Sequence, residues 1–288
     1  MQSIVYLNGQ FMPMDQAQIP VMDRGFLFGD AVYEVIPFYQ GVGFQLEQHL
    51  RRLAQSLEAV GIQLALNWES IFSRLLELNP GDHQAIYLQV SRGVMPQRTL
   101  RYAKDIQPTV FAYSYPIRLA LEGALEEIKG VTAVTVIDQR WGRCDIKATG
   151  LMANVLAIRE AQQRGAQEAL LVRQGYLTEG ASCNLFLVEQ GRIYTPLMDR
   201  HTLAGTTRSL LLELIRAAGS NCTEQAIAEQ RLKHADEVWI SSSTRGVLPV
   251  VQINNQPVAT GQPGPLWLRV AQLFRQFEQQ MLVNDEKR

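Results

Sequence analysis

The chain reads Cys144-Asp-Ile-Lys147 and, further on, Tyr176-Leu-Thr-Glu179-Gly-Ala-Ser-Cys-Asn-Leu-Phe186. An amine can attack a carbonyl carbon and form an imine, and a carboxylate can hold a proton on a ring nitrogen. A lysine usually lies on the solvated surface, so neither residue identifies a site by itself. The pair predicts covalent amine chemistry only in combination with the segments around it.

Strand and helix patterns follow one another irregularly around these stretches. Gly-containing turns at 174–175 and 190–191 divide the Glu179 region into short strands. Apolar residues three and four positions apart, each run closed by a glycine, predict helices over 46–60, 151–164 and 207–218. Without the strict alternation of a barrel or a doubly wound sheet, the fold class expected is α/β, with helices and strands mixed as in α+β folds.

The chain length of 288 residues suggests two domains. The segment Leu119 to Lys129 lies between Pro116 and Gly130 and has the character of a boundary. We therefore expect a smaller domain over 1–118 and a larger one over 119–288, the second carrying both Lys147 and Glu179.

Composition argues against several classes of function. The 27 basic and 28 acidic side chains give a net charge of −1 with no basic stripe, which disfavours nucleic acid and anionic membranes as partners. There is no signal-peptide pattern and no apolar run near the ~20 residues that span a bilayer. Three cysteines and four histidines lack metal-ligand spacing, which predicts reduced thiols in the cytoplasm and no metal site.

Three further segments have the chemistry of a binding site. Leu203-Ala-Gly205-Thr206-Thr207-Arg208 opens into a helix, where a glycine, two hydroxyls and free N–H groups suit a phosphate, although threonine also caps ordinary helices. His49-Leu-Arg-Arg52 places arginines on a helix, and arginine grips phosphate with two N–H groups or lies on a solvated face. Asp23-Arg-Gly-Phe-Leu-Phe-Gly-Asp-Ala-Val-Tyr33-Glu34 predicts a tightly turned, buried polar segment, in which Tyr33 belongs to a site or to the core.

Taken together, these segments resemble the class-IV, fold-type IV aminotransferases that use pyridoxal 5'-phosphate, and among them the D-amino acid (D-alanine) aminotransferases. The resemblance covers nearly the whole chain. It rests on the following motifs in order: Asp23-Arg-Gly…Phe-Gly-Asp…Val-Tyr-Glu34, His49-x-x-Arg-Leu, Ser91-Arg-Gly, Arg140-Trp…Arg-Cys-Asp-Ile-Lys147, Thr178-Glu-Gly…Ser-x-Asn-Leu-Phe and Gly205-x-Thr-Arg208.

The resemblance implies a role for each matching residue. Lys147 holds the cofactor covalently and moves the proton, and Glu179 pairs with the pyridine nitrogen. Tyr33 helps to place the substrate carboxylate. The remaining cofactor contacts implied are Arg52, Thr206, Thr207, Ser242 and Ser243 around the phosphate and Leu203 against the ring. The resemblance also implies two domains with the cofactor between them, and a homodimer whose partner subunit supplies the substrate-side loop.

One motif departs from the D-alanine aminotransferase pattern. An Arg-x-His pair binds the substrate carboxylate there, and an ungapped match puts Gln97 and Thr99 at its positions. Arg98 and Arg101 are close by and offer the two-pronged contact that a carboxylate prefers. The activity expected is transamination between a D-amino acid, D-alanine first, and a 2-oxo acid such as 2-oxoglutarate. Aminodeoxychorismate lyase stays open because of this departure, and Val32-Tyr33-Glu34-Val35 argues against branched-chain aminotransferase.

Overall fold

A computed structural model describes residues 3–285 of the chain. Contacts between Cα atoms divide it into two compact units: Met1–Arg118 with Ile146–Gly150, and Leu119–Asp145 with Leu151–Arg288. The structure therefore differs from the expected division at one place, because the short segment that carries Lys147 groups with the first unit. The physical reason is backbone pairing with the first unit's sheet, since Tyr33 N–H donates to Lys147 O over 2.9 Å and Thr149 N–H donates to Ala31 O over 3.0 Å.

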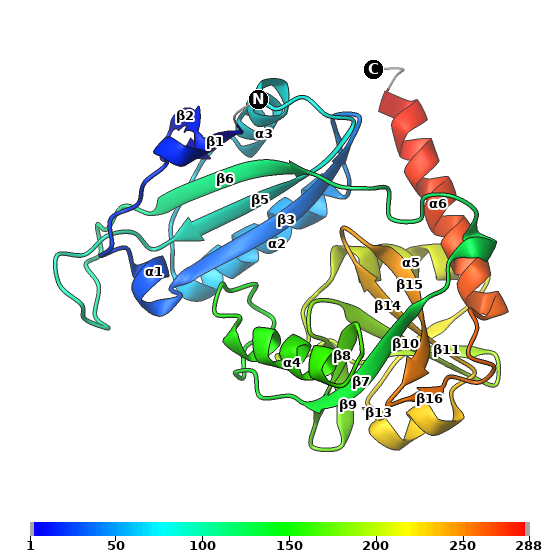
Figure 1. Ribbon diagram of the computed structural model, residues 1–288. Coiled ribbons are helices and arrows are strands. Elements are labelled where there is room, and N and C mark those ends of the chain that lie inside the picture. Colours follow the sequence, from blue (N-terminus) through cyan, green and yellow to red (C-terminus); the bar gives the residue numbers. More distant parts are fainter. Residues whose placement is uncertain (1–2, 286–288) are drawn as a thin grey trace. The chain divides into compact units, whose positions relative to one another are not determined.

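The first unit contains a six-stranded antiparallel sheet in the order β2-β1-β6-β5-β3-β4. Its strands β3, β5 and β6 lie side by side in Figure 1. The strands are β1 (Ile4–Leu7), β2 (Gln10–Pro13), β3 (Ala31–Tyr39), β4 (Val42–Gly43), β5 (His83–Ser91) and β6 (Thr109–Pro116), and the helices are α1 (Arg24–Phe28), α2 (Leu46–Val60) and α3 (Trp68–Leu78).

One face of this sheet packs on α2 and α3 around a shared apolar core. Leu53 and Leu57 of α2 and Phe72 and Leu75 of α3 are buried there, and each such side chain contributes about 1.5–3 kcal/mol. The helix predicted over 46–60 has those same bounds. It ends because Gly61 adopts the left-handed conformation, with φ of 68°, at which the chain leaves the helix.

The second unit contains a ten-stranded mixed sheet in the order β12-β11-β10-β14-β15-β7-β8-β9-β13, with β16 paired to β15. The central pairs β15–β7 and β7–β8 are parallel. The strands are β7 (Val131–Ile137), β8 (Glu168–Arg173), β9 (Tyr176–Gly180), β10 (Asn184–Glu189), β11 (Arg192–Thr195), β12 (Cys222–Glu224), β13 (Ile227–Ala228), β14 (Glu237–Ser242), β15 (Gly246–Ile253) and β16 (Gln256–Pro257).

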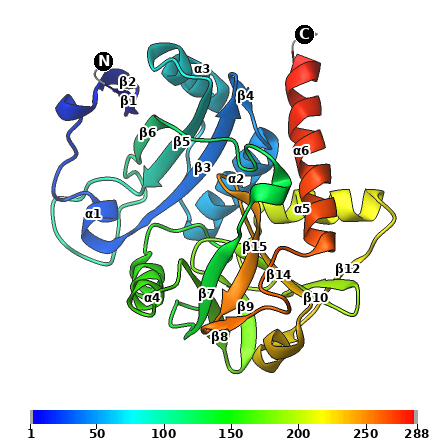
Figure 2. The ribbon, with the colours of Figure 1, turned by 45° about the vertical axis from the view of Figure 1, so that its right-hand side comes forward.

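Helices pack on different parts of this second sheet (Figure 2). The helix α4 (Met152–Gln163) contacts β7 and β8, whereas α5 (Thr206–Ala217) and α6 (Pro265–Asp285) contact each other and β14. The carboxylate of Glu237 accepts hydrogen bonds from the N–H groups of Leu266 and Trp267, over 2.9 and 2.7 Å, and so fixes the start of α6. The mixed α and β content agrees with the expected fold class.

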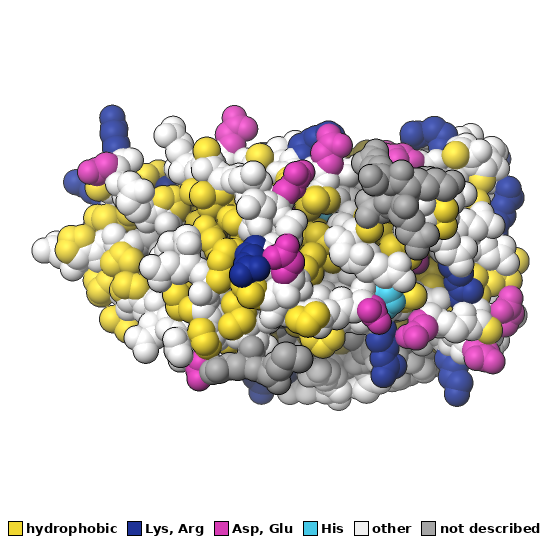
Figure 3. Space-filling model, turned by 90° about the horizontal axis from the view of Figure 1, so that it is seen from above, with side chains coloured by type: hydrophobic (Ala, Val, Ile, Leu, Met, Phe, Trp, Pro, Cys, Tyr) yellow, Lys and Arg dark blue, Asp and Glu magenta, His cyan; other side chains and the backbone are white. Residues whose placement is uncertain are grey.

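The described helices contain no stretch that is both long and apolar enough to cross a bilayer. On the face shown in Figure 3, basic and acidic side chains are interspersed instead of gathered by sign. This face therefore shows no broad surface of one charge.

Candidate active site

Lys147 lies beside β3 in the first unit. Ala148 and Val32 form an antiparallel bridge, and the backbone N–H of Lys147 donates to Ser56 Oγ on α2 over 3.3 Å. The amine Nζ stands 4.2 Å from the centre of the Tyr33 ring, close enough for a cation–π contact. The structure thus brings together two of the residues that the motifs single out, and it fixes the lysine backbone from two sides.

Tyr33 is supported in turn by a second tyrosine on β5. The rings of Tyr33 and Tyr87 stack with centres 5.7 Å apart and planes 27° apart. The Tyr87 hydroxyl donates to Gln89 Oε1 over 2.7 Å. Burial, together with the neighbouring tyrosines, raises the pKa of Tyr87 to about 12, so this phenol stays neutral at physiological pH.

Arg52 is buried in a polar cluster that joins α2 to β3. Its Nε and Nη2 donate to Oε1 and Oε2 of Glu34, each over 2.8 Å, and His49 Nδ1 lies 2.7 Å from Glu34 Oε2. Burial acts to raise the pKa of Glu34, but the charge and hydrogen bonds of Arg52 and His49 lower it to about 2. Burial lowers the pKa of His49 from its ordinary value, although Glu34 opposes this.

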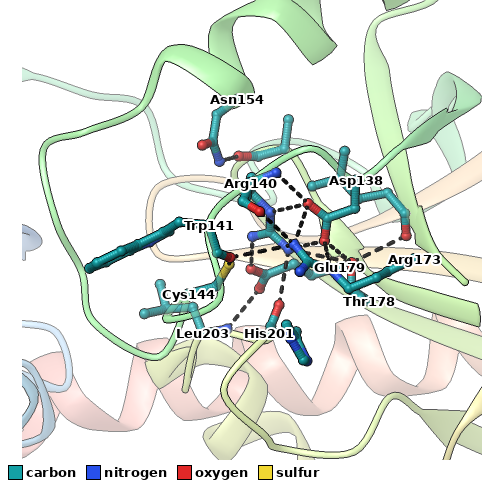
Figure 4. A network of polar contacts seen from close by, with 12 residues as sticks. Asp138, Arg140, Trp141, Cys144, Asn154, Arg173, Thr178, Glu179, His201 and Leu203 are labelled. Atoms are coloured by element: carbon teal, nitrogen blue, oxygen red, sulfur yellow. Dashed lines mark hydrogen bonds and ion pairs between the residues drawn. The ribbon is translucent and has the colours of Figure 1, made fainter.

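Glu179 is the centre of a second cluster, in the second unit (Figure 4). One carboxylate oxygen is ion-paired with Arg140. The other accepts from Asn184 Nδ2 over 3.1 Å and from the backbone N–H of Leu203 over 3.0 Å. Asn184 Nδ2 also donates to Leu203 O over 2.9 Å. The carboxylate is therefore held in one orientation by donors from three different segments of the chain.

Arg140 is itself fixed from its other side. Its Nε and Nη2 donate to the two oxygens of Asp138, each over 2.9 Å, and its Nη2 donates to His201 O over 3.0 Å. Burial acts to raise the pKa of Asp138, but the hydrogen bonds from Arg140 and Arg173 outweigh it and hold this pKa far below its ordinary value. Burial acts to lower the pKa of Arg140, but Asp138 and Glu179 raise it. The side chains of Asp138, Arg140, Arg173 and Glu179 converge in Figure 4.

Hydroxyl groups gather where α5 begins. Thr206 Oγ1 lies 3.2 Å from Ser243 Oγ, and Thr207 Oγ1 is buried without a hydrogen-bond partner among residues 3–285. The preceding residue, Gly205, starts the helix without a side-chain cap. A Cβ at position 205 would lie 1.9 Å from Asn184 Oδ1, so the chain approaches this amide more closely than any other residue type allows. The helix predicted from 207 begins at Thr206.

The remaining predicted residues differ in exposure: Ser242 on the phosphate side is half-buried, whereas Arg98 and Arg101 on the substrate side are exposed. Ser242 is half-buried at the end of β14, where its Oγ lies 3.3 Å from Arg245 Nε. Arg98 and Arg101 are exposed in the segment between β5 and β6. Arg98 stands over the Phe28 ring, with 4.9 Å from its guanidinium carbon to the ring centre.

The structure assembles the predicted residues into two sets. Lys147, Tyr33 and Arg52 belong to the first unit, whereas the second holds Glu179, Leu203, Thr206, Thr207, Ser242 and Ser243. Sequence reasoning quoted Arg140, His49, Glu34 and Asn184 in motifs without giving them partners, and it did not single out Asp138. Their signal was weak because a motif does not show which side chains meet in the folded chain, even where the partners are as near in sequence as Asp138 and Arg140 or Glu179 and Asn184.

Known proteins match this chain over most of its length. Residues 31–253 match the family model for amino-transferase class IV. D-Alanine aminotransferase from Bacillus licheniformis is 40% identical over 265 residues, covering 91% of this chain and 92% of its own. D-Alanine aminotransferase from Staphylococcus aureus strain COL is 33% identical over 276 residues, covering 95% and 97%.

Solved structures share the fold. Branched-chain aminotransferase from Escherichia coli superposes with a TM-score of 0.86 at 24% identity over 94% of this chain and 93% of its own. The enzyme from Thermoproteus uzoniensis superposes with a TM-score of 0.85 at 24% identity over 100% and 97%. The fold is thus that of fold-type IV aminotransferases, and the chain belongs to the class IV aminotransferases, a family of enzymes that use pyridoxal phosphate.

Proposed function

We propose that this chain catalyses pyridoxal-phosphate-dependent transamination between a D-amino acid, D-alanine first, and a 2-oxo acid such as 2-oxoglutarate. The two D-alanine aminotransferases, 40% and 33% identical over almost all of their length, support the substrate class. One structural observation carries the chemistry: the Glu179 carboxylate, held by Arg140 and Asn184, adjoins a segment that leads into a hydroxyl-rich helix start.

The residues around α5 fit a bound phosphate. Thr207 Oγ1 is a buried hydroxyl with no partner in the described chain, which is costly unless a ligand satisfies it. The first N–H groups of α5 have no side-chain cap, and a helix start favours an anion. Thr206, Thr207 and Ser243 would then hold the phosphate, with Ser242 beside them.

Pyridoxal phosphate, when bound, supplies an aldehyde that accepts an amine and a protonated ring that withdraws electrons from the substrate carbon. In our proposal, Lys147 Nζ provides the covalent attachment and then takes and returns the proton. Glu179 holds the proton on the ring nitrogen, and Leu203 packs against the ring. Arg52, oriented by Glu34, contributes to phosphate binding.

The substrate carboxylate requires a cation and a positioned hydroxyl. Tyr33 stands beside the Lys147 amine and is stacked on Tyr87, so its hydroxyl is oriented. Arg98 and Arg101 carry the charge in place of the family's Arg-x-His pair, because a guanidinium binds a carboxylate with two hydrogen bonds. We further propose that the enzyme works as a homodimer in the cytoplasm. The free thiols of Cys144, Cys183 and Cys222 suit that compartment.

The test of the activity is acceptor dependence. Purified protein loaded with pyridoxal phosphate is mixed with D-alanine, with and without 2-oxoglutarate, and pyruvate is measured. We expect pyruvate and glutamate in equal amounts, only when both substrates are present. L-Alanine and L-leucine serve as matched donors, and Lys147→Ala serves as the inactive variant. Pyruvate from aminodeoxychorismate without any acceptor would instead support a lyase, and faster turnover of L-leucine would support a branched-chain aminotransferase.

A further inference from the structure

Asp30 binds two buried arginines at once in the first unit. Arg24 Nε donates to Asp30 Oδ2 over 2.8 Å. Arg92 Nε donates to the same oxygen over 2.8 Å, and its Nη2 donates to Oδ1 over 3.0 Å. The side chains of Arg24 and Arg92 are only 5% and 6% exposed, so their charges depend on this carboxylate. We call these three residues the arginine clamp.

One end of the clamp holds the segment between β5 and β6. Arg24 Nη1 donates to Thr99 O over 2.6 Å, and its Nη2 donates to Leu100 O over 3.3 Å. The guanidinium carbon of Arg92 lies 3.9 Å from the centre of the Tyr102 ring. The contacts fall on Thr99, Leu100 and Tyr102, on both sides of the exposed Arg101, in a segment without helix or regular strand.

The other end of the clamp is attached to regular structure. Arg92 Nη2 and Nη1 donate to Val60 O and Gly61 O, at the end of α2, over 2.6 and 3.1 Å. Arg24 begins α1, and Asp23 caps that helix by accepting from Gly25 N–H over 2.7 Å. The segment that carries Arg98 is therefore linked by Arg24 to α1 and by Arg92 to the end of α2.

Arg98 has a support of its own within this arrangement. The guanidinium carbons of Arg24 and Arg98 each lie 4.9 Å from the centre of the Phe28 ring. A planar guanidinium stacks well on an aromatic ring, which limits the directions that an exposed arginine takes. Phe28 belongs to α1, so this ring and Arg24 of the clamp are part of one element.

We infer that the arginine clamp and Phe28 are positioning residues, which set where Arg98 meets the substrate carboxylate. Arg98 contacts the ligand in this account, whereas the clamp acts on the segment through the carbonyl groups of Thr99 and Leu100 and through the Tyr102 ring. The predicted effect on substrate binding rests on the proposed function. The predicted ordering of residues 97–104 rests on the observed contacts alone.

The experiment compares the wild type with Asp30→Asn in the loaded enzyme. Hydrogen exchange read by mass spectrometry should be roughly tenfold faster in residues 97–104 and unchanged in α2 and α3. The KM values for D-alanine and for 2-oxoglutarate should rise together by roughly tenfold, because both carry a carboxylate next to the reacting carbon. The kcat value and the affinity for pyridoxal phosphate should stay within about twofold.

Two variants and a control complete the design. Arg24→Lys keeps the charge but not the fork, so we expect faster exchange as in Asp30→Asn. Phe28→Leu removes the ring without leaving a buried charge unpaired, and it should raise both KM values even where Asp30→Asn fails to fold. Glu77→Gln, in an exposed pair with Arg74, should change neither readout.

The outcomes distinguish the ordering of residues 97–104 by the clamp from the effect of the clamp on substrate binding by Arg98. Unchanged exchange in 97–104 in both Asp30→Asn and Arg24→Lys overturns the clamp. Faster exchange with unchanged KM values overturns its link to Arg98. A wild-type protein without transaminase activity contradicts the proposed function, while the exchange arm still decides whether the clamp orders the segment.

Discussion

Arg52 and Glu34 form a buried ion pair with two hydrogen bonds of 2.8 Å each, which joins α2 to β3. His49, one turn earlier on α2, lies 2.7 Å from the same carboxylate. Arg52, for which the resemblance implies phosphate binding, is therefore oriented by the carboxylate of Glu34. Its direction is set by the fold before any ligand binds.

This pair predicts how stability depends on pH. The pKa of Glu34 falls from an ordinary 4.5 to about 2 in the folded protein. A lowered folded-state pKa means that the carboxylate stabilises the fold above pH 4.5 and that this stabilisation is lost as the pH falls from 4.5 towards 2. We expect the unfolding free energy of the apoprotein to drop by about 3 kcal/mol in this window from this group.

Guanidinium unfolding at several pH values checks this prediction. Glu34→Gln should be less stable at pH 7, by roughly 3–5 kcal/mol, because Arg52 then lacks a charged partner. It should also lose most of the pH dependence between 4.5 and 2. The matched control is Glu47→Gln, which removes an exposed carboxylate paired with Arg51 on the same helix. Equal slopes in Glu34→Gln and wild type would show that Glu34 is not responsible.

Local patterns predicted the parts of the fold that depend on local physics. The helix over 46–60 follows from its apolar spacing and from Gly61, which ends it. The pairing of residues 146–150 with β3 joins positions over a hundred residues apart, and no local pattern encodes it. This contact moves Lys147 into the first unit, against the expected division of the chain.

The candidate site shows the same limit. Lys147, Glu179 and Thr206 stand out because their residue types suit a chemistry at that place in a motif. Asn184 and Asp138 act only through the side chains that they hold, Glu179 and Arg140, so their residue types alone carried no signal even though these partners are near in sequence.

Replacing Thr207 should affect cofactor binding without lowering the stability of the fold. Its hydroxyl is buried and has no hydrogen-bond partner in the described part of the chain. Thr207→Val should therefore not lower the unfolding free energy of the apoprotein, while it should weaken pyridoxal phosphate binding roughly tenfold. Thermal unfolding and cofactor titration by absorbance measure the two effects.

The control for this prediction is Thr195→Val. The Thr195 hydroxyl donates to Leu185 O over 2.7 Å, so its loss should cost roughly 1 kcal/mol of stability and leave cofactor affinity unchanged. If Thr207→Val instead destabilises the apoprotein as Thr195→Val does and keeps full cofactor affinity, the phosphate site lies elsewhere.

Gly205 predicts a purely steric effect. Its φ of −66° is open to any residue, but a Cβ would meet Asn184 Oδ1 at 1.9 Å. Gly205→Ala should displace this amide from Glu179 and cost roughly 1–3 kcal/mol, with weaker cofactor binding. Gly142→Ala is the matched control, since a Cβ there meets nothing within 4 Å. Cofactor titration of both variants decides, and equal affinities would contradict the close approach at Asn184.

Replacing Arg140 should lower the turnover rate without preventing the covalent link between Lys147 and the cofactor. Arg140→Met removes the cation paired with Glu179, so the carboxylate is no longer held in place. We expect kcat to fall roughly 10- to 100-fold while Lys147 still takes up the cofactor. Arg143→Met, which breaks an exposed pair with Asp145 in the same loop, should keep the wild-type rate. Equal turnover in the two variants would remove Arg140 from the working site.

The central claim is that Lys147 is the residue that binds pyridoxal phosphate covalently. The most direct measurement is to load the protein, reduce it with borohydride, digest it and locate the added mass by mass spectrometry, with Lys147→Ala treated in parallel. The account predicts the phosphopyridoxyl mass on Lys147 and none in the variant. Modification of another lysine in both proteins, or of none in the wild type, would contradict it.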